Sequence, residues 1–232
     1  MKIGFDIISD LNLTNGNNFD WENKATSLYC IIAGNISNDL SIVQNTLTKL
    51  SNYYQGVFFI PGFLEYENSS DVELRTVELT KICKRISNVA LLYQHVVVID
   101  GIAIIACTGW FDHLENHDTE LANNIKILQI EDLHYLKNSL EKLQKHLDVV
   151  KIVVVTNSVP NAGLYFGEVP ENVNTKIPLN IVLMADTMKK VSHWIFGSHK
   201  KIVETEYNGI NYLNNPCHGK NPYWAKRIDL EV

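Results

Sequence analysis

Five polar loops along the chain carry side chains suited to metal or proton chemistry. They follow short apolar runs and span residues 10–12, 34–35, 62–65, 156–158 and 197–200. Carboxylate, carboxamide and imidazole groups are ligands that divalent cations take in proteins. Because the carboxyl ends of parallel strands meet at one edge of an open α/β sheet, we expect the five loops to form one shared site.

The order and spacing of these loops resemble the five signature motifs of the calcineurin-like metallophosphoesterases, and the resemblance covers nearly the whole chain. That family carries D-x-H, G-D, G-N-H-[ED], a lone His after a later strand, and G-H-x-H. The segment from Asn214 through Pro216 to Gly219, followed by Asn221 and Pro222, is similar to the N-P-x-G-Y closing segment of the small bacterial and phage members. The resemblance implies a scaffold for hydrolysis of phosphoric esters with two divalent cations.

The first two motifs keep few of the family's ligands. Asp10 corresponds to the first Asp of D-x-H and is retained, whereas Asn12 stands in place of the His. Asn35 stands in place of the Asp that bridges the two metals. A carboxamide oxygen can bind a hard cation but brings no charge to offset it, so the resemblance implies a dismantled site at these positions.

The third and fourth motifs depart further from the family's pattern. Phe63 and Leu64 replace the Asn and the His of the third motif, while Glu65 keeps its acidic final position. Asn157 replaces the lone His of the fourth motif. A leucine neither binds a metal nor transfers a proton, so the group that acts on the leaving group in the family has no counterpart here.

The last motif replaces both of its histidines, by Ser198 and Lys200, and leaves His199 between them at the variable position. Two alternatives remain for Lys200. Its ammonium group either occupies the vacated metal volume and pairs with Asp10, or it points to solvent while Asp10 bonds to backbone amides.

We expect no resident metal cofactor at these loops. Two cations about 3.5–4 Å apart need a carboxylate between them, and the matching positions retain too few anionic ligands. The alternative is one weakly bound divalent ion, such as Mn or Mg, held by Asp10 and His199. His113 and His117 have the spacing of two ligands on one helix face, although a solvated acidic turn is the simpler interpretation.

The elements that must position the loops alternate between strand and helix. Continuous apolar runs at 28–33, 57–60 and 151–155 predict buried parallel strands. Asp100 and Gly101, between two further apolar runs, predict a hairpin. The chain therefore moves from a parallel sheet into a second, partly antiparallel one.

Helical periodicity predicts the remaining elements. A helix follows residue 38, another begins at a capping box formed by Ser70 and Glu73, a third spans 120–147, and a fourth lies near 183–190. The predicted fold class is α/β, with one domain over residues 1–232. The architecture, which the resemblance also implies, is a four-layer α/β/β/α sandwich of two mixed sheets flanked by helices.

Composition limits the classes of partner. The net charge of −6 argues against general affinity for nucleic acid. The longest apolar run, near 96–105, is interrupted by two polar turn residues and is too short to cross a bilayer. The four cysteines are scattered without a C-x-x-C pair, which favours reduced thiols and a cytoplasmic location.

We interpret the chain as a catalytically inactive phosphoesterase relative that binds another protein or itself. Candidate contact regions are the loop at 160–176, the loop at 63–66 and the helix at 133–147. One alternative is an active phosphatase or nuclease with an atypical single-metal site. Another is a non-hydrolysing sensor of a phosphorylated small ligand. The composition also suggests a viral origin.

Overall fold

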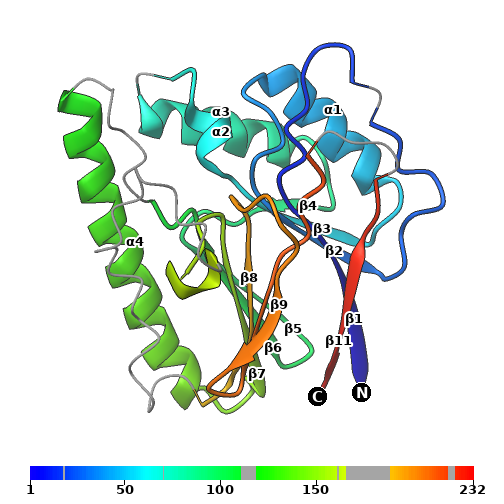
Figure 1. The fold of residues 1–232 in the computed structure, drawn as a ribbon. Coiled ribbons are helices and arrows are strands. Elements are labelled where there is room, and N and C mark those ends of the chain that lie inside the picture. The colour runs from blue at the N-terminus through cyan, green and yellow to red at the C-terminus, as the bar shows by residue number, and fades with distance from the viewer. Residues whose placement is uncertain (18, 70, 111–118, 161, 166–188, 219–222) are drawn as a thin grey trace.

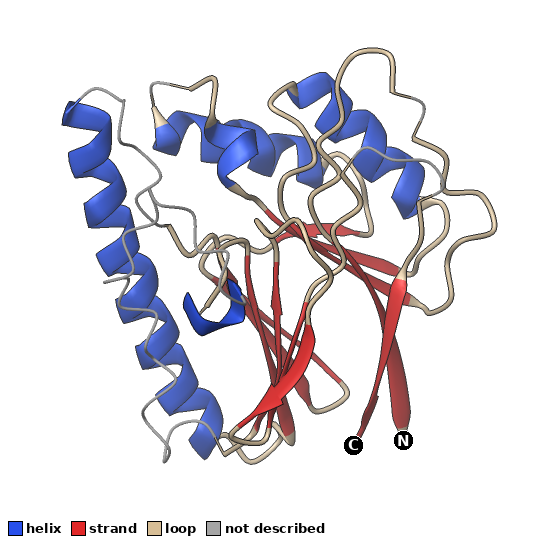
Figure 2. Cartoon of the chain, in the orientation of Figure 1, coloured by secondary structure: helices blue, strands red, loops and turns tan. Residues whose placement is uncertain are grey.

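Two β-sheets packed face to face form the centre of the molecule, with helices on both outer surfaces (Figures 1 and 2). The computed structural model describes residues 1–17, 19–69, 71–110, 119–160, 162–165, 189–218 and 223–232. The sequence predicted this α/β/β/α sandwich. The core between the sheets consists of aliphatic side chains from both inner faces, including Ile7, Ile31, Ile104, Val153 and Ile195.

The first sheet has five strands in the order β11-β1-β2-β3-β4. Its members are β1 (Lys2–Ile8), β2 (Tyr29–Ala33), β3 (Gly56–Ile60), β4 (Val89–Leu91) and β11 (Lys226–Glu231). β1 to β4 are parallel, and β11 runs antiparallel along β1. Because of this pairing the two ends of the chain lie side by side (Figure 1), where the Met1 amino group donates to the Val232 carbonyl.

The second sheet has six strands in the order β5-β6-β7-β8-β10-β9. Its members are β5 (His95–Ile99), β6 (Ile102–Cys107), β7 (Lys151–Thr156), β8 (Val191–Phe196), β9 (Glu204–Tyr207) and β10 (Ile210–Leu213). The four central strands are parallel, whereas β5 and β9 are antiparallel edges. The hairpin of β5 and β6 turns at Asp100 and Gly101, which both have positive φ, as the sequence predicted.

Each outer surface carries one helical layer. α1 (Leu40–Ser51) and α3 (Val72–Lys84) cover the first sheet, and the long α4 (Thr119–Lys145) covers the second (Figure 1). α4 buries Leu136, Leu140 and Leu143 against the second sheet, so these leucines of the predicted helix form a sheet-facing surface. In the described ranges no helix combines the length and apolar character needed to cross a membrane. All four cysteines are buried and unpaired.

The predicted capping box of α3 is wrong. The N-cap residue is Asp71, whose carboxylate accepts a hydrogen bond of 2.9 Å from the Leu74 amide. An Asp in extended backbone conformation, three residues before that amide, satisfies the helix start without a preceding serine. Ser70 itself lies outside the described residues.

Other differences from the predicted elements are local. β4 was not predicted because three residues carry little periodic signal. Residues predicted as a polar loop form the short helix α2 (Phe63–Tyr66). The predicted helix near 183–190, the pair His113 and His117, and most of the loop at 160–176 lie outside the described residues.

Candidate functional site

The five polar loops meet at one end of the two sheets, beyond the carboxyl ends of β1, β2, β3, β7 and β8. Backbone hydrogen bonds join the first two loops, from the Asp10 amide to the Gly34 carbonyl and from the Asn12 amide to the Asn35 carbonyl. The side chain of Asn157 links the two sheets, because its amide group donates to the Ala33 carbonyl at 2.9 Å. The ten predicted positions therefore come from loops that share one region.

The backbone turns sharply at this end of the sheets. Asp10, Asn12, Asn35, Ser198 and His218 all have φ between 45° and 60°. This left-handed conformation is uncommon for residues other than glycine, although Asp and Asn tolerate it best. Such conformations persist when the surrounding contacts hold them, and these five residues are all in the loops that meet here.

The carboxamide of Asn35 is the centre of the site. Its amide group donates to the Asp10 carboxylate at 2.8 Å and to the Ser198 hydroxyl at 3.1 Å. Its oxygen accepts from the Leu64 amide at 3.0 Å. The neutral side chain of Asn35 thus connects its own loop with those of Asp10, Ser198 and Leu64. The family resemblance implies a bridging carboxylate at this position.

Asn157 and Ser198 extend the same network. The Ser198 hydroxyl donates to the Asn157 side-chain oxygen at 2.9 Å, and the Phe63 amide donates to that oxygen at 3.2 Å. Asn157 is 1% exposed, so these bonds form away from solvent. In a buried site each satisfied amide contributes to rigidity, whereas an unsatisfied one would be costly.

Three glycines allow the loops to pack this closely. A Cβ atom on Gly62 would lie 2.5 Å from Asn35 Oδ1 and 2.6 Å from Asn157 Cγ. A Cβ on Gly34 would lie 2.5 Å from Asn157 Nδ2, and one on Gly197 would lie 2.8 Å from the same atom. All four distances are below those of real Cβ contacts. The side chain of Asn157 thus leaves no room for a Cβ at these three glycines, and backbone atoms add to this restriction at Gly34 and Gly197.

Glu65 faces backbone amides instead of the centre of the site. Its buried carboxylate accepts from the amides of Gly62 at 2.6 Å, Asn35 at 3.0 Å, Ile36 at 2.5 Å and Ser37 at 3.3 Å. Burial raises the pKa of Glu65 to about 7, against the lowering effect of these four donors. The retained acid thus joins the second loop to the start of α2.

Asp10 keeps one open oxygen. Its Oδ1 accepts from Asn35 and from the Ser198 amide at 2.9 Å, whereas Oδ2 has no hydrogen-bond partner among the described residues. Asp10 is 2% exposed, and burial raises its pKa, while the bond from Asn35, the adjacent Ser9 hydroxyl, the Ser198 amide and the His218 ring lower it. Lys200 is exposed and forms no ion pair with Asp10. Of the two alternatives for Lys200, the pairing with Asp10 is wrong. The lysine is exposed to solvent, and Asp10 Oδ1 accepts from Asn35 and from the Ser198 backbone amide.

His218, which is not among the ten predicted positions, lies at the site. Its amide donates to the Asp10 carbonyl at 2.6 Å. Its ring joins the Asn12 side chain at 3.3 Å and the Lys200 carbonyl at 3.0 Å. The signal that could have identified it is its place in the closing segment, two residues after Pro216, which pairs with Ser9.

The ring of His199, unlike that of His218, bonds within its own loop. His199 is buried, its Nδ1 lies 2.8 Å from the Lys201 carbonyl, and its ring packs edge-on against Phe196.

Phe63 and Leu64 are both partly buried, and the ring of Phe63 contacts Trp110 edge-on. The third motif therefore presents apolar groups at the border of the network.

The donor set does not fit a pair of divalent cations. Of the two retained acids, Glu65 is directed at four backbone amides and only Asp10 faces the centre. Within the described part of the chain no group of three or more His, Cys, Asp or Glu residues is placed to hold a metal ion. Neutral amides cannot offset the charge of two closely spaced dications.

Sequence reasoning also missed two buried carboxylates. Asp132 of α4 accepts from the Gly109 amide at 2.7 Å and from the Gln94 side chain at 2.9 Å, and burial raises its pKa to about 6. Asp6 accepts from the Thr26 amide at 2.7 Å and from the Tyr54 hydroxyl at 2.9 Å. Both connect secondary-structure elements, so they have structural roles.

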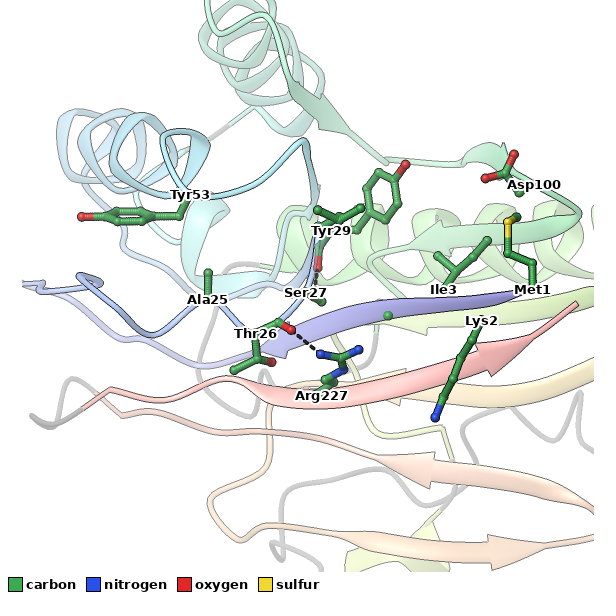
Figure 3. A pocket seen from close by; sticks show the side chains of 12 residues that line it. Met1, Lys2, Ile3, Ala25, Thr26, Ser27, Tyr29, Tyr53, Asp100 and Arg227 are labelled. Carbon is green, nitrogen blue, oxygen red and sulfur yellow. Dashed lines mark hydrogen bonds between the residues drawn. The ribbon is translucent and has the colours of Figure 1, made fainter.

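A separate hollow of about 560 Å³ lies at the opposite end of β1 and β2 (Figure 3). None of the ten predicted positions lines it. Arg227 lines this hollow, and its guanidinium group donates to the Thr26 carbonyl and to Asp229 at 2.8 Å. Because Arg227 is already bonded to these acceptors within the protein, we assign no ligand to this hollow.

Comparison with known sequences gives little information about the family of this chain. No family profile matches the chain. The uncharacterized protein L509 of Acanthamoeba polyphaga mimivirus is 24% identical over 124 residues. The match covers 50% of this chain and 42% of that protein, so it spans less than half of the viral relative.

Comparison with solved structures gives stronger similarity of fold. The phosphopantetheinyl hydrolase PptH of Mycobacterium tuberculosis has a TM-score of 0.68 at 14% identity, covering 98% of this chain and 96% of that one. A protein assigned as a 5′-nucleotidase from Staphylococcus aureus has a TM-score of 0.60 at 12% identity, with coverage of 100% and 51%. GAP50, the anchor in the inner membrane complex of Plasmodium, has a TM-score of 0.59 at 12% identity, with coverage of 93% and 71%.

The chain has the fold of the calcineurin-like metallophosphoesterases, as its five motifs predicted. The two mixed sheets, the outer helices and the position of the loops agree with that class. These low identities establish the fold alone, because one fold hosts many functions.

Replacement of Gly62 by alanine tests the packing around Asn157. The added Cβ collides with two carboxamides, so we expect a loss of about 1–3 kcal/mol in the free energy of unfolding, measured by urea denaturation. Gly56→Ala, at the other end of β3, is the control, because its Cβ meets no carboxamide and only the side-chain rings of Tyr29 at 3.1 Å and Phe58 at 3.4 Å. In Gly62→Ala/Asn157→Ala the two losses should be less than additive. Full additivity would contradict this contact.

The raised pKa of Glu65 predicts that the stability of the protein depends on pH. The unfolded carboxyl ionises near 4.5 and the folded one near 7, so between these values the folded chain binds more protons. The contribution to stability is complete below about pH 4.5, falls by at most about 3 kcal/mol as pH rises through 7, and is then constant. Urea titrations across this range should show a smaller decline for Glu65→Gln than for the wild type. Equal declines would contradict the assignment.

Proposed function

We propose that this chain is a catalytically inactive member of the phosphoesterase-like proteins and that it acts as a protein-binding module. The observation that carries the proposal is the position of the Asn35 carboxamide. It donates to Asp10 and Ser198 and accepts from the Leu64 amide. These bonds join the loops from within the protein, so the loops need no metal to hold them together.

The chemistry of the site also opposes hydrolysis. A two-metal mechanism needs cations that generate hydroxide and stabilise the phosphoryl oxygens. The neutral groups of Asn35, Asn157 and Ser198 supply neither charge nor a general base of suitable pKa. Leu64 stands where the family has the histidine that acts on the leaving group.

A binding role is supported by the retained fold and by one structural neighbour. A stable sandwich keeps its surfaces after its active site has been lost, and function lies in sites rather than in folds. GAP50, which shares this fold at 12% identity, is described as an anchor in an inner membrane complex. We propose an analogous non-catalytic role here, with another protein as the partner.

A single-metal phosphoesterase is the second candidate, and one atom favours it. Asp10 Oδ2 is buried without a hydrogen-bond partner among the described residues, and such a group is normally satisfied. His218, whose amide bonds to the Asp10 carbonyl, lies beside Asp10, whereas the ring of His199, the ligand expected for a single metal, bonds to the Lys201 carbonyl. One cation bound here would lack the second ion that clamps the phosphoryl group.

An activity assay with added manganese separates the two candidates. The protein is incubated with Mn²⁺ and with generic phosphomonoester and phosphodiester substrates. We expect no turnover above the buffer rate, and no change in Asp10→Asn, which keeps the volume of the side chain. Turnover that is lost in Asp10→Asn and retained in Lys200→Ala, at a residue exposed beside the site, would overturn the proposal.

A further inference from the structure

A groove of about 420 Å³ runs between the N-terminal turns of α3 and the N-terminal half of α4. Its lining combines apolar and acidic side chains, namely Val72, Ile127, Leu128, Asp71, Glu73 and Glu131, together with Asn124. The groove lies among the outer helices and includes none of the ten site positions. Figure 1 shows α4 standing beside the helical layer that contains α3.

The two helices expose large apolar side chains, and one of these, Ile127, lines the groove. Ile127 is 55% exposed and Ile130 is 50% exposed, and their spacing of three places them together on α4. Val77, one turn after Glu73 on α3, is 46% exposed. Isolated apolar side chains are common on protein surfaces, but a group on two adjacent helices is typical of a contact surface.

Packing within the molecule accounts for only some of the apolar side chains of α4. Ile125 is buried in the core and Leu128 packs against that core. The helix uses Leu136, Leu140 and Leu143 to cover the second sheet, and these are buried. Ile127 and Ile130 lie off that stripe. A helix whose apolar residues exceed its sheet-facing stripe has a second apolar surface.

The charge of the groove is uniformly negative. Three carboxylates line it, no basic residue does, and Glu73 and Glu131 form no ion pair within the described ranges. Asp71 and Glu73 stand at the start of α3, where the helix dipole favours acids. Glu131 lies in the middle of α4, so the dipole does not explain it. Apolar residues between carboxylates are complementary to an apolar surface flanked by Lys or Arg.

We propose that the groove between α3 and α4 binds a basic amphipathic helix of a partner protein. A channel between two helices accommodates a third helix, which presents apolar residues at i, i+3 and i+4 to its floor. Lysines or arginines beside that stripe then meet Glu73 and Glu131. The inference rests on the binding role proposed above, for which it names the class of partner.

The test uses a synthetic helical peptide with a Leu/Ile stripe flanked by lysines, labelled for fluorescence anisotropy with the whole protein. Two further peptides serve as probes, one with the lysines changed to glutamates and one with the apolar stripe scrambled. The lysine peptide should bind at least about 10-fold more tightly than either. Its affinity should fall as salt is raised, because the carboxylates are exposed.

Matched variants locate the binding surface. Ile127→Asn should weaken the lysine peptide by about 10-fold, and Glu131→Lys by about 3-fold or more. Val150→Asn, at another exposed apolar position, and Glu141→Lys, further along α4, should stay within about 2-fold of the wild type. All four are surface changes, and circular dichroism checks that each variant is folded.

Equal binding of the lysine and glutamate peptides, or unchanged affinity in Ile127→Asn and Glu131→Lys, would overturn the proposal. Sedimentation of the protein alone tests a second occupant. A dimer that dissociates in Ile127→Asn would mean that a second copy covers the groove, which also overturns it. These outcomes are separate from the manganese assay, since loss of peptide binding leaves the absence of turnover unaffected.

Discussion

The hydrogen bond between the Asn35 carboxamide and the Asp10 carboxylate is the interaction on which the arrangement of the loops depends. It joins the ends of β1 and β2, and its partners Ser198 and Leu64 bring in the second sheet and α2. A carboxylate at position 35 would face Asp10 with like charge, and that arrangement would need a cation or a shared proton between the two groups. A carboxamide removes the repulsion, so the end of the sandwich is held by neutral groups.

Because the hydrogen-bond network fills this end of the sheets, the proposed binding surface lies on the outer helices. The side chains of Asn35, Asn157 and Ser198 bond within the protein, whereas Asp10 Oδ2 and the adjacent Ser9 Oγ are buried without a hydrogen-bond partner among the described residues. The groove between α3 and α4 has the opposite character, because Glu73, Ile127 and Glu131 are exposed to solvent. A stable interior combined with unpaired outer side chains is consistent with a fold retained for recognition instead of catalysis.

Much of the fold could be predicted from the sequence, since long apolar runs such as 151–155 and turn pairs such as Asp100 and Gly101 carry strong local signals. The meeting of the five loops followed from the same strands. What could not be predicted depends on tertiary contacts: Asp71 in place of Ser70 as the N-cap, and His218 beside Asp10. Whether Lys200 pairs with Asp10 was also beyond the sequence, because it depends on side-chain direction, and the structure places Lys200 in solvent.

Anomalous X-ray diffraction from crystals grown with manganese is the most direct test of the central claim. The account predicts no anomalous peak between Asp10 and Asn35, with the carboxamide of Asn35 within hydrogen-bond distance of the Asp10 carboxylate. Two anomalous peaks about 3.5–4 Å apart between these residues would contradict it, because neutral amides would then be holding a dinuclear centre.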